Sequence, residues 1–302
     1  MSNARVLVLG GAGFIGTHLC SQLLRDGYEV SVFGRSEPKH ADNRIRYISG
    51  DFSDARIVQH VVMGQDYIFH LIHGTNPPNV NSDITGDIKR TVLPTLSFLE
   101  ACAGSSIKKV LFLSSGGTVY GNNGVVASRE NDPTIPMSAY GAHKLLLENY
   151  FRVFATAKNL DYTILRLSNP YGPFQSTEKG VGLIAAVVNA IKSGATLDVY
   201  GDGGTQRDYI FVSDAVKAMS AAIPYAGEHK IFNIGSGEGR SVSEIISLVE
   251  DATRSRLNKK TLPERSFDVK KSVLDISLIR NELNWRPIIG LREGITITLN
   301  SL

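Results

Sequence analysis

A glycine-rich turn between an apolar strand and a helix constrains the fold of this chain more than any other feature. The apolar run Val6–Leu9 leads directly into the sequence GGAGFIG at residues 10–16. This sequence satisfies G-x-G-x-x-G and the related G-x-x-G-x-x-G pattern, in which glycines let the backbone approach a pyrophosphate at the N-terminus of the next helix. The turn therefore predicts a dinucleotide site with these cofactor-binding residues: Gly10, Gly13, Phe14, Ile15 and Gly16.

The first half of the chain alternates predicted strands with predicted helices. The expected strands are Val6–Leu9, Glu29–Phe33, Arg44–Ser49, Tyr67–Ile72, Val110–Ser114 and Tyr162–Leu167. The expected helices are Phe14–Arg25, Ile57–Met63, Ile88–Ala103 and Ala139–Lys158, and Pro94 is expected to bend the third of them. Near-continuous apolar strands joined by helices predict an α/β fold, a doubly wound parallel sheet of the Rossmann type.

The pattern becomes less regular after Leu167. Residues 168–182 and 200–209 are rich in Gly, Pro and Asn, which is typical of loops that form binding sites. Helices are expected over residues 182–193, 212–222 and 241–251. We therefore expect a dinucleotide-binding Rossmann domain over residues 1–167. Residues 168–302 are expected to form mainly a smaller substrate domain, with some segments returning to the main sheet.

Composition narrows the class of protein. A formal net charge of +3 is too small to indicate a nucleic-acid partner. The two cysteines, Cys20 and Cys102, lie in apolar helix-like contexts, so we expect small buried core residues, no disulfide and a reducing cytoplasm. The longest apolar run, residues 181–188, is too short to span a bilayer, so no membrane association is expected. The histidines show no spacing typical of metal ligands, so no metal is expected.

The residues after the second strand bear on the choice of dinucleotide. An acidic side chain there would bind the ribose hydroxyls of NAD, but this chain has Gly34 and Arg35. Arg35 can receive the 2′-phosphate of NADP, stack on adenine, or simply be a solvated loop residue. Asp51, after the third strand, is placed to reach the adenine amino group. NAD is the expected cofactor, and NADP stays open as the alternative.

A tyrosine and a lysine four residues apart indicate the chemistry. Tyr140 and Lys144 share one face of a predicted helix. A free tyrosine has a pKa of about 10, and a nearby ammonium together with the positive nicotinamide ring favours its phenolate. Tyr140 is therefore the expected acid–base catalyst, and Lys144 is expected to hold the cofactor ribose as well. His143 is expected to face away from the reaction.

Hydroxyl groups gather where the fifth predicted strand ends. The sequence SSGGTVYG at residues 114–121 follows that strand, at the edge of the sheet where ligands bind in such folds. One of these hydroxyls is expected to donate a hydrogen bond to the reacting oxygen of the substrate.

Together these motifs resemble the extended short-chain dehydrogenases/reductases of the nucleotide-sugar epimerase branch, to which the UDP-glucose 4-epimerases belong. The resemblance covers nearly the whole chain. Its markers are residues 10–16, 114–121, 140–144, 166–173, 201–212 and 284–285.

The resemblance implies roles for residues that the spacing alone does not identify. Asn169 would contact the diphosphate or sugar, Arg207 would clamp the diphosphate, and Arg265 with Asp268 would hold the phosphates and the nucleotide ribose. Planar guanidinium groups suit phosphate oxygens. Phe52 and Leu71 are further cofactor-binding candidates. The family also implies a homodimer that pairs through helices near residues 88–103 and 139–158.

Two positions depart from the family pattern. The family's catalytic hydroxyl lies two residues before Thr118, where this chain has Gly116. Ser115 or Thr118 must then supply the hydrogen bond, and Thr118 is the preferred candidate of the two. The family's asparagine, early in the helix before the fifth strand, is Thr91 here.

The resemblance implies reversible hydride transfer through a transient 4-keto sugar, which makes a nucleotide-sugar 4-epimerase the main hypothesis. The substrate would be UDP-glucose/UDP-galactose or an N-acetyl analogue. Dehydratases and decarboxylases of this kind carry acidic residues where this chain has Gly117 and Thr118, so elimination and decarboxylation are disfavoured. An NADP-dependent reductase of a nucleotide sugar or related carbonyl is the alternative. A module that binds NAD(P) without catalysis is the third, against which Tyr140 and Lys144 argue.

Overall fold

The computed structural model describes residues 4–35, 42–74, 80–176, 182–265 and 269–301. The chain divides into two compact units. Unit 1 comprises residues 1–114, 142–165 and 216–232, and unit 2 comprises residues 115–141, 166–215 and 233–302. The second unit therefore takes a segment from the first half of the chain, and residues 216–232 return to the first unit.

A seven-stranded sheet forms the centre of unit 1. Its strands are β1 (Arg5–Leu9), β2 (Glu29–Gly34), β3 (Arg46–Ser49), β4 (Tyr67–His70), β5 (Lys109–Ser115), β6 (Tyr162–Leu167) and β10 (Ile231–Ile234). Their order is β10-β6-β5-β4-β1-β2-β3. β1 pairs in parallel with both β2 and β4. The chain moves outward to β2 and β3 and then resumes at β4 on the other side of β1, so the order reverses beside β1, where ligands bind in such sheets. The predicted doubly wound parallel sheet is confirmed.

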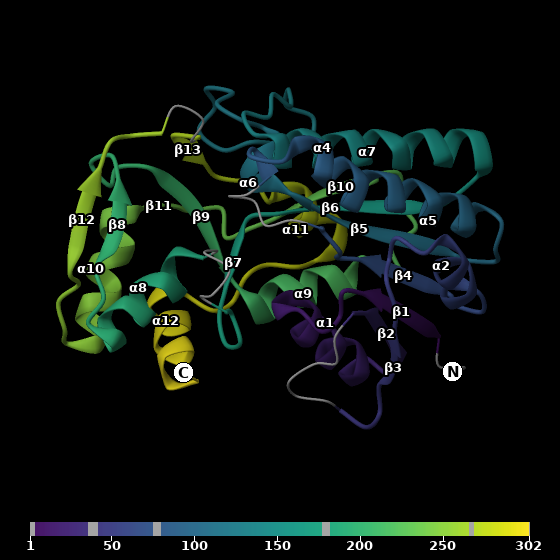
Figure 1. Ribbon diagram of the computed structural model, residues 1–302, viewed down its shortest axis with the longest axis horizontal. Coiled ribbons are helices and arrows are strands. Elements are labelled where there is room, and N and C mark those ends of the chain that lie inside the picture. Colours follow the sequence, from purple (N-terminus) through teal and green to yellow (C-terminus); the bar gives the residue numbers. More distant parts are fainter. Residues whose placement is uncertain (1–3, 36–41, 75–79, 177–181, 266–268, 302) are drawn as a thin grey trace. The chain divides into compact units, whose positions relative to one another are not determined.

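Helices cover both faces of this sheet, which explains why its strands are apolar along their whole length. The helices are α1 (Phe14–Arg25), α2 (Ala55–Val62), α4 (Ile84–Asp87), α5 (Leu93–Ala103), α7 (Ala139–Lys158) and α9 (Val212–Ala221). Figure 1 shows α2, α5 and α7 along one face and α1 and α9 along the other. In the core between strands and helices, Phe112 of β5 stacks on Phe151 of α7 with ring centroids 4.9 Å apart.

The predicted helix over residues 88–103 is not a single bent α-helix. Residues Ile88–Val92 form a π-helix, η1, and α5 begins at Leu93. Pro94 lies in the first turn of α5, where its missing N–H is tolerated best. The expected bend at Pro94 is therefore a change of helix type just before it. Such π-helical turns occur frequently at functional sites.

Unit 2 contains two smaller sheets and its own helices. Its strands are β7 (Asn169–Tyr171), β8 (Leu197–Tyr200), β9 (Gln206–Phe211), β11 (Gly239–Ser241), β12 (Lys259–Leu262) and β13 (Lys271–Ser272). β9 pairs with β7, β11 and β13, and β8 pairs with β12. The helices are α6 (Gly116–Val119), α8 (Leu183–Ser193), α10 (Val242–Thr253), α11 (Ser277–Leu283) and α12 (Leu291–Asn300). A second core lies among α8, α10, α12 and the strands, with Val187, Ile245 and Ile295 fully buried.

Some segments expected to be loops are strands instead. β7 lies within residues 168–182, and β9 begins within residues 200–209.

Both cysteines are free and buried, as expected, and burial raises the pKa of the Cys20 thiol to about 12. Among the described residues, no helix combines the length and the apolar character that a bilayer crossing requires.

Candidate active site

The glycine turn after β1 has the form that a dinucleotide requires. Gly10 adopts a φ of +84°, which favours glycine, and its N–H donates to the carbonyl of Phe33 at 2.8 Å. A Cβ on Gly16 would lie 2.5 Å from the carbonyl oxygen of Gly10, so helix α1 can approach the turn only without a side chain there. A Cβ on Gly11 would likewise lie 2.5 Å from Val32. These contacts explain why small residues recur through the turn.

The N-terminus of α1 is open to an anion. Gly13 is its N-cap residue, makes no side-chain capping hydrogen bond, and is followed by no acidic residue in the first turn. The nearest atom to a Cβ built on Gly13 would be 3.4 Å away, so the backbone there is not covered by neighbouring side chains of the described residues. Amide groups at such a helix start favour a pyrophosphate. The residues present therefore fit the dinucleotide predicted from the sequence.

Two charged residues lie at the ends of neighbouring strands beside this turn. Arg35 follows β2 and is exposed, and Asp51 follows β3, which pairs with β2. Asp51 accepts hydrogen bonds from the N–H and hydroxyl of Ser53, both at 2.8 Å. These bonds lower the pKa of Asp51, and the charge of Arg35 lowers it further. Asp51 is therefore held as an ionised acceptor close to Arg35.

The remaining cofactor candidates differ in what they can offer. Phe52 is 7% exposed and packs edge-on against His70, with ring centroids 5.1 Å apart, so its ring belongs to the core and only its backbone is available. Leu71 donates its N–H to Leu9 at 3.0 Å and continues β4 beside the glycine turn. Phe14 and Ile15 are partly exposed in the first turn of α1.

Helix α7 carries Tyr140 and Lys144 one turn apart. Lys144 is 3% exposed, and its ammonium donates to the carbonyl of Leu113 at 2.8 Å. The same ammonium lies 4.8 Å from the centroid of the Phe112 ring. Burial lowers the pKa of Lys144 to about 8, although the charges of Asp87 and Glu148 act in the opposite direction. A lysine with a pKa near neutrality at a helix turn from a tyrosine is a strong candidate for proton chemistry.

A buried polar cluster around Asp87 was not predicted from the sequence. Asp87 is fully buried and accepts a hydrogen bond from the hydroxyl of Thr91 at 2.9 Å. His143 Nδ1 lies 2.6 Å from the other carboxylate oxygen of Asp87. Thr91, where the family has asparagine, also accepts from the N–H of Gly74 at 2.9 Å. The sequence feature that could have indicated this cluster is His143, within the Tyr140–Lys144 motif. Its partner, Asp87, lies 56 residues earlier in the chain.

In unit 2, the short helix α6 presents the hydroxyl candidates. A Cβ on Gly116 would lie 2.5 Å from Leu274 and 3.0 Å from the carbonyl oxygen of Arg166. Leu274 therefore occupies the space that a side chain at this position needs, which explains the glycine. The hydroxyl of Thr118 donates to the carbonyl of Ser115 at 3.5 Å. That bond directs the Thr118 hydroxyl into its own turn.

Ser115 and Asn169 converge above Gly117. An ideal Cβ on Gly117 would lie 3.9 Å from Ser115 Oγ and 3.8 Å from the Asn169 side-chain nitrogen. The amide of Asn169 also donates to the carbonyl of Asp208 at 3.0 Å, which fixes its orientation. A Cβ on Gly141 would lie 2.8 Å from the carbonyl oxygen of Thr118, so the start of α7, with Tyr140, packs closely on α6.

The predicted phosphate-binding arginines both lie in unit 2. Arg207, on β9, donates to the carbonyl of Gln206 at 2.8 Å and to that of Val269 at 2.5 Å. The guanidinium of Arg265 lies 3.4 Å from the centroid of the Tyr200 ring, in a cation–π arrangement. Both guanidinium groups are thus preoriented. Asp268 lies outside the described residues.

A buried aspartate organises this part of unit 2. Asp208 is fully buried and accepts hydrogen bonds from the N–H of Ser236 at 2.7 Å and of Gly237 at 3.1 Å. The hydroxyl of Ser236 and the N–H of Leu274 also donate to it, at 2.8 and 3.3 Å. The Asp208 carboxylate therefore connects β9 to the segments that contain Ser236, Gly237 and Leu274. Its backbone carbonyl contacts the side chain of Asn169.

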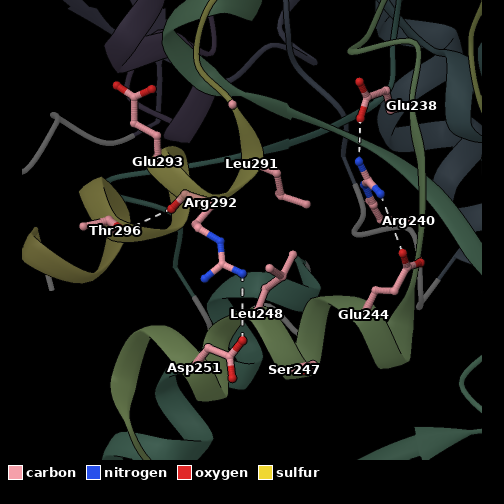
Figure 2. A pocket seen from close by; sticks show the side chains of 11 residues that line it. Glu238, Arg240, Glu244, Ser247, Leu248, Asp251, Leu291, Arg292, Glu293 and Thr296 are labelled. Atoms are coloured by element: carbon pink, nitrogen blue, oxygen red, sulfur yellow. Dashed lines mark hydrogen bonds and ion pairs between the residues drawn. The ribbon is translucent and has the colours of Figure 1, made fainter.

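A separate charged groove of about 880 Å³ lies between α10 and α12 in unit 2. Figure 2 shows Arg240 between Glu238 and Glu244, and Arg292 facing Asp251. The nitrogen–oxygen distances are 2.7 Å for Arg240–Glu238 and 3.9 Å for Arg292–Asp251. The lining, as far as the structure describes it, includes none of the residues predicted for catalysis or binding.

Comparison with known proteins identifies the family. The sequence profile described as the NAD dependent epimerase/dehydratase family matches residues 6–235, which is more than half of the chain. The chain belongs to this family. As a family member, it is an NAD-dependent enzyme of the epimerase class, and the resemblance noted from its motifs is confirmed.

Individual relatives extend over nearly the whole chain. A UDP-glucose 4-epimerase of Mycolicibacterium smegmatis is 32% identical and covers 98% of this chain and 97% of its own length. A dTDP-4-dehydro-6-deoxyglucose reductase of Escherichia coli is 31% identical with the same coverage. The crystal structure of a UDP-glucose 4-epimerase with UDP-glucose from Thermotoga maritima superimposes with a TM-score of 0.93, 32% identity and 98% coverage of each chain.

A metal site would need several His, Cys, Asp or Glu side chains close together, and none was expected from the sequence. Within the described ranges, no group of three or more His, Cys, Asp or Glu side chains is arranged to hold a metal ion. The histidines nearest Lys144 instead cluster around Asp87, where His73 Nε2 lies 3.5 Å from the carboxylate.

Proposed function

We propose that this protein is a nucleotide-sugar 4-epimerase acting on a UDP-hexose, either UDP-glucose/UDP-galactose or an N-acetyl analogue. The observation that carries the proposal is the buried Lys144 ammonium one helical turn after Tyr140 in a member of the NAD-dependent epimerase family. Relatives named as UDP-glucose 4-epimerases match 98% of the chain, which supports the same assignment.

When bound, NAD would supply reversible hydride transfer to and from C4 of the sugar. The first turn of α1 and the backbone of Gly10 and Gly13 would hold its pyrophosphate, and Asp51 would face the adenine. The chain's own part in the reaction is proton transfer. Tyr140, as phenolate, accepts the C4 hydroxyl proton when the 4-keto sugar forms and returns it to the oxygen when the sugar is reduced on its other face.

Lys144 supports Tyr140 in two ways. Its positive charge favours the phenolate over the phenol. Its burial and its hydrogen bond to Leu113 fix the ammonium in one place, so no reorganisation is needed during the reaction. The oxidation of the sugar at C4 and its later reduction both use Tyr140 and Lys144. This suits an epimerisation, in which substrate and product have the same oxidation state.

We assign the second hydroxyl to Ser115 rather than to Thr118. Ser115 Oγ and the Asn169 side-chain nitrogen each lie within 4 Å of the position of a Cβ on Gly117, whereas the Thr118 hydroxyl donates to a backbone carbonyl. Ser115→Ala should lower kcat by about 10²-fold, the usual effect of losing one donor to a developing oxyanion. Thr118→Val should lower it by less than a tenth of that factor. Steady-state assays of both variants test the assignment, and the opposite ranking would refute it.

The diphosphate of the substrate would bind to the oriented guanidinium groups of unit 2. Arg207 and Arg265 present planar guanidinium groups that suit phosphate oxygens, and Asn169 offers a side-chain amide from the neighbouring strand β7. Asp268 is proposed for the nucleotide ribose. Binding energy from the nucleotide half does not depend on which face the sugar presents, so the sugar can turn while the nucleotide stays bound.

The proposal is tested by interconversion without added cofactor. Purified protein should convert UDP-galactose to UDP-glucose, or the N-acetyl pair, with no NAD or NADH added, and denaturation should release NAD identified by its mass. The absence of interconversion for all four sugars would overturn the proposal. Dehydration and decarboxylation products are not expected, because Gly117 and Thr118 provide no carboxyl group.

An NADP-dependent reductase is the second candidate, favoured by one relative and one residue. The Escherichia coli reductase aligns along 98% of this chain, and Arg35 is exposed after β2, where NAD-binding folds have an acid. If Arg35 reads the 2′-phosphate, Arg35→Ala should weaken NADP binding by about tenfold or more and leave NAD binding nearly unchanged. Calorimetric titration with both nucleotides measures this, and an equal loss for NAD and NADP would exclude that role.

We also propose a cytoplasmic homodimer formed through α5 and α7. Each of these helices exposes at least one large apolar side chain, with Leu93 52% and Val153 54% exposed. Paired helices would cover them. Sedimentation equilibrium should give twice the chain mass of 32.8 kDa, and a single-chain mass at micromolar concentration would contradict the dimer.

A further inference from the structure

Asp87 is the most completely buried acid near the proposed catalytic lysine. It is 0% exposed and lies at the end of α4, in unit 1. Its two oxygens contact different elements: Thr91 of η1 donates to one at 2.9 Å, and His143 of α7 lies 2.6 Å from the other. His143 immediately precedes Lys144, so the carboxylate is fastened to the turn of α7 that carries the ammonium.

The π-helix holds this arrangement in place. Asp87 is the N-cap residue of this π-helix and Thr91 lies in its turn, and Thr95 donates its hydroxyl to the carbonyl of Thr91 at 2.6 Å. The Thr95 hydroxyl also lies 3.0 Å from His70 Nε2. The carboxylate is therefore oriented by a continuous chain of buried hydrogen bonds rather than by solvent. Buried hydrogen-bond networks restrict the geometry of the groups that they join.

The charges around Lys144 come from several elements. Asp87 (α4) and Glu148 (α7) favour its protonated form. Glu148 accepts a hydrogen bond from Ser114 at the end of β5. His70 on β4 and His73 after it feel the charge of Lys144, and burial lowers the pKa of both imidazoles. Since neutral imidazoles supply no countercharge, the two carboxylates are left to balance the ammonium.

We infer that Asp87 is a positioning residue whose buried carboxylate, oriented by His143 and Thr91, acts together with Glu148 as a countercharge that keeps the Lys144 ammonium protonated inside the protein. A cation removed from water is stable only beside a well-placed anion. His143 would tie that anion to α7, which explains a histidine within the catalytic motif. The catalytic consequence rests on the proposed function, but the electrostatic one does not.

The direct test is the titration of Lys144 itself. Protein labelled with ¹³C at the lysine Cε carbons is titrated by NMR, and the Lys144 signal is assigned by its absence in Lys144→Met. The midpoint is expected near pH 8 in the unchanged protein. In Asp87→Asn it should fall by about one pH unit or more, because an opposite charge nearby shifts a pKa by that amount. An unchanged midpoint in folded Asp87→Asn would overturn the inference.

Asp83→Asn is the matched control. It makes the same change of charge four residues earlier, at a side chain that is 53% exposed. Asparagine caps helices as well as aspartate, so α4 keeps its N-cap. The Lys144 midpoint should stay where it is in the unchanged protein. An equal shift in both variants would mean that net charge, not Asp87, sets the titration, and would also refute the inference.

A double variant decides the matter if Asp87→Asn does not fold. Removing one partner of a buried pair leaves an uncompensated charge, whereas removing both can be neutral. Asp87→Asn/Lys144→Met should therefore be more stable to urea than Asp87→Asn alone. A double variant that is no more stable would contradict the countercharge role.

Turnover provides the link to catalysis. Raising the pH deprotonates Lys144, so turnover should decline above about pH 8 in the unchanged protein. In Asp87→Asn the decline should move to lower pH together with the NMR midpoint, whereas a purely structural defect would lower turnover without moving the profile. If no sugar is epimerised at any pH but the NMR midpoint still shifts, the proposed function fails and the role of Asp87 stands.

Discussion

Tyr140→Phe is expected to lower the epimerase turnover number by about two to four powers of ten, the usual effect of losing an acid–base group. The substitution removes only one oxygen, so binding of the nucleotide sugar should change little. Steady-state kinetics and a binding titration with the UDP-sugar, performed on the same preparation, separate the two effects. Near-normal turnover would show that Tyr140 does not move the proton.

Tyr150→Phe is the matched control for this experiment. Tyr150 lies on the same helix, ten residues later, and packs against the core of unit 1. Removing its hydroxyl should leave turnover close to that of the unchanged protein. A comparable loss in both variants would mean that α7 tolerates no such change, and the role of Tyr140 would then be unsupported.

Asp208→Ala is expected to lower the free energy of unfolding of unit 2 by more than about 3 kcal/mol, because three backbone N–H groups and a hydroxyl lose their buried acceptor. Burial raises the pKa of the Asp208 carboxyl, whereas its hydrogen bonds lower it. Urea unfolding followed by the fluorescence of Trp285, the single tryptophan, reports on unit 2.

Asp198→Ala provides the comparison for Asp208→Ala. Asp198 is exposed on β8 of the same unit, and its removal should change stability by less than about 0.5 kcal/mol. If Asp208→Ala were as mild as Asp198→Ala, the buried carboxylate would not be the anchor of β9. A large loss would also predict weaker UDP-sugar binding, since Asn169 is oriented by the backbone of Asp208.

The glycine turn and the parallel sheet were predictable because their causes are local. Gly16 must be small because its Cβ would meet the carbonyl of Gly10, and a strand buried on both faces reads as an apolar run. The short strands of unit 2 were missed for the opposite reason. β11 contains glycine, arginine and serine and exists through its pairing with β9, where Gly239 lies opposite Asp208.

The candidate site was predictable where one motif carried it and not where distant residues meet. Tyr140 and Lys144 share a helix, so their spacing alone places them together. The Asp87–His143 contact joins residues 56 positions apart and depends on a π-helix that no periodicity indicates. The space taken by Leu274 beside Gly116 is likewise a tertiary contact.

The fate of the hydrogen at C4 tests the central claim most directly. UDP-glucose carrying deuterium at C4 is incubated with the purified protein and no added cofactor, and the UDP-galactose formed is analysed by mass spectrometry and NMR. We expect the deuterium to be retained at C4 with inverted configuration, because the same hydrogen leaves and returns while Tyr140 exchanges only the hydroxyl proton. Product that has lost the deuterium, or a product formed only when NADPH is added, would contradict it.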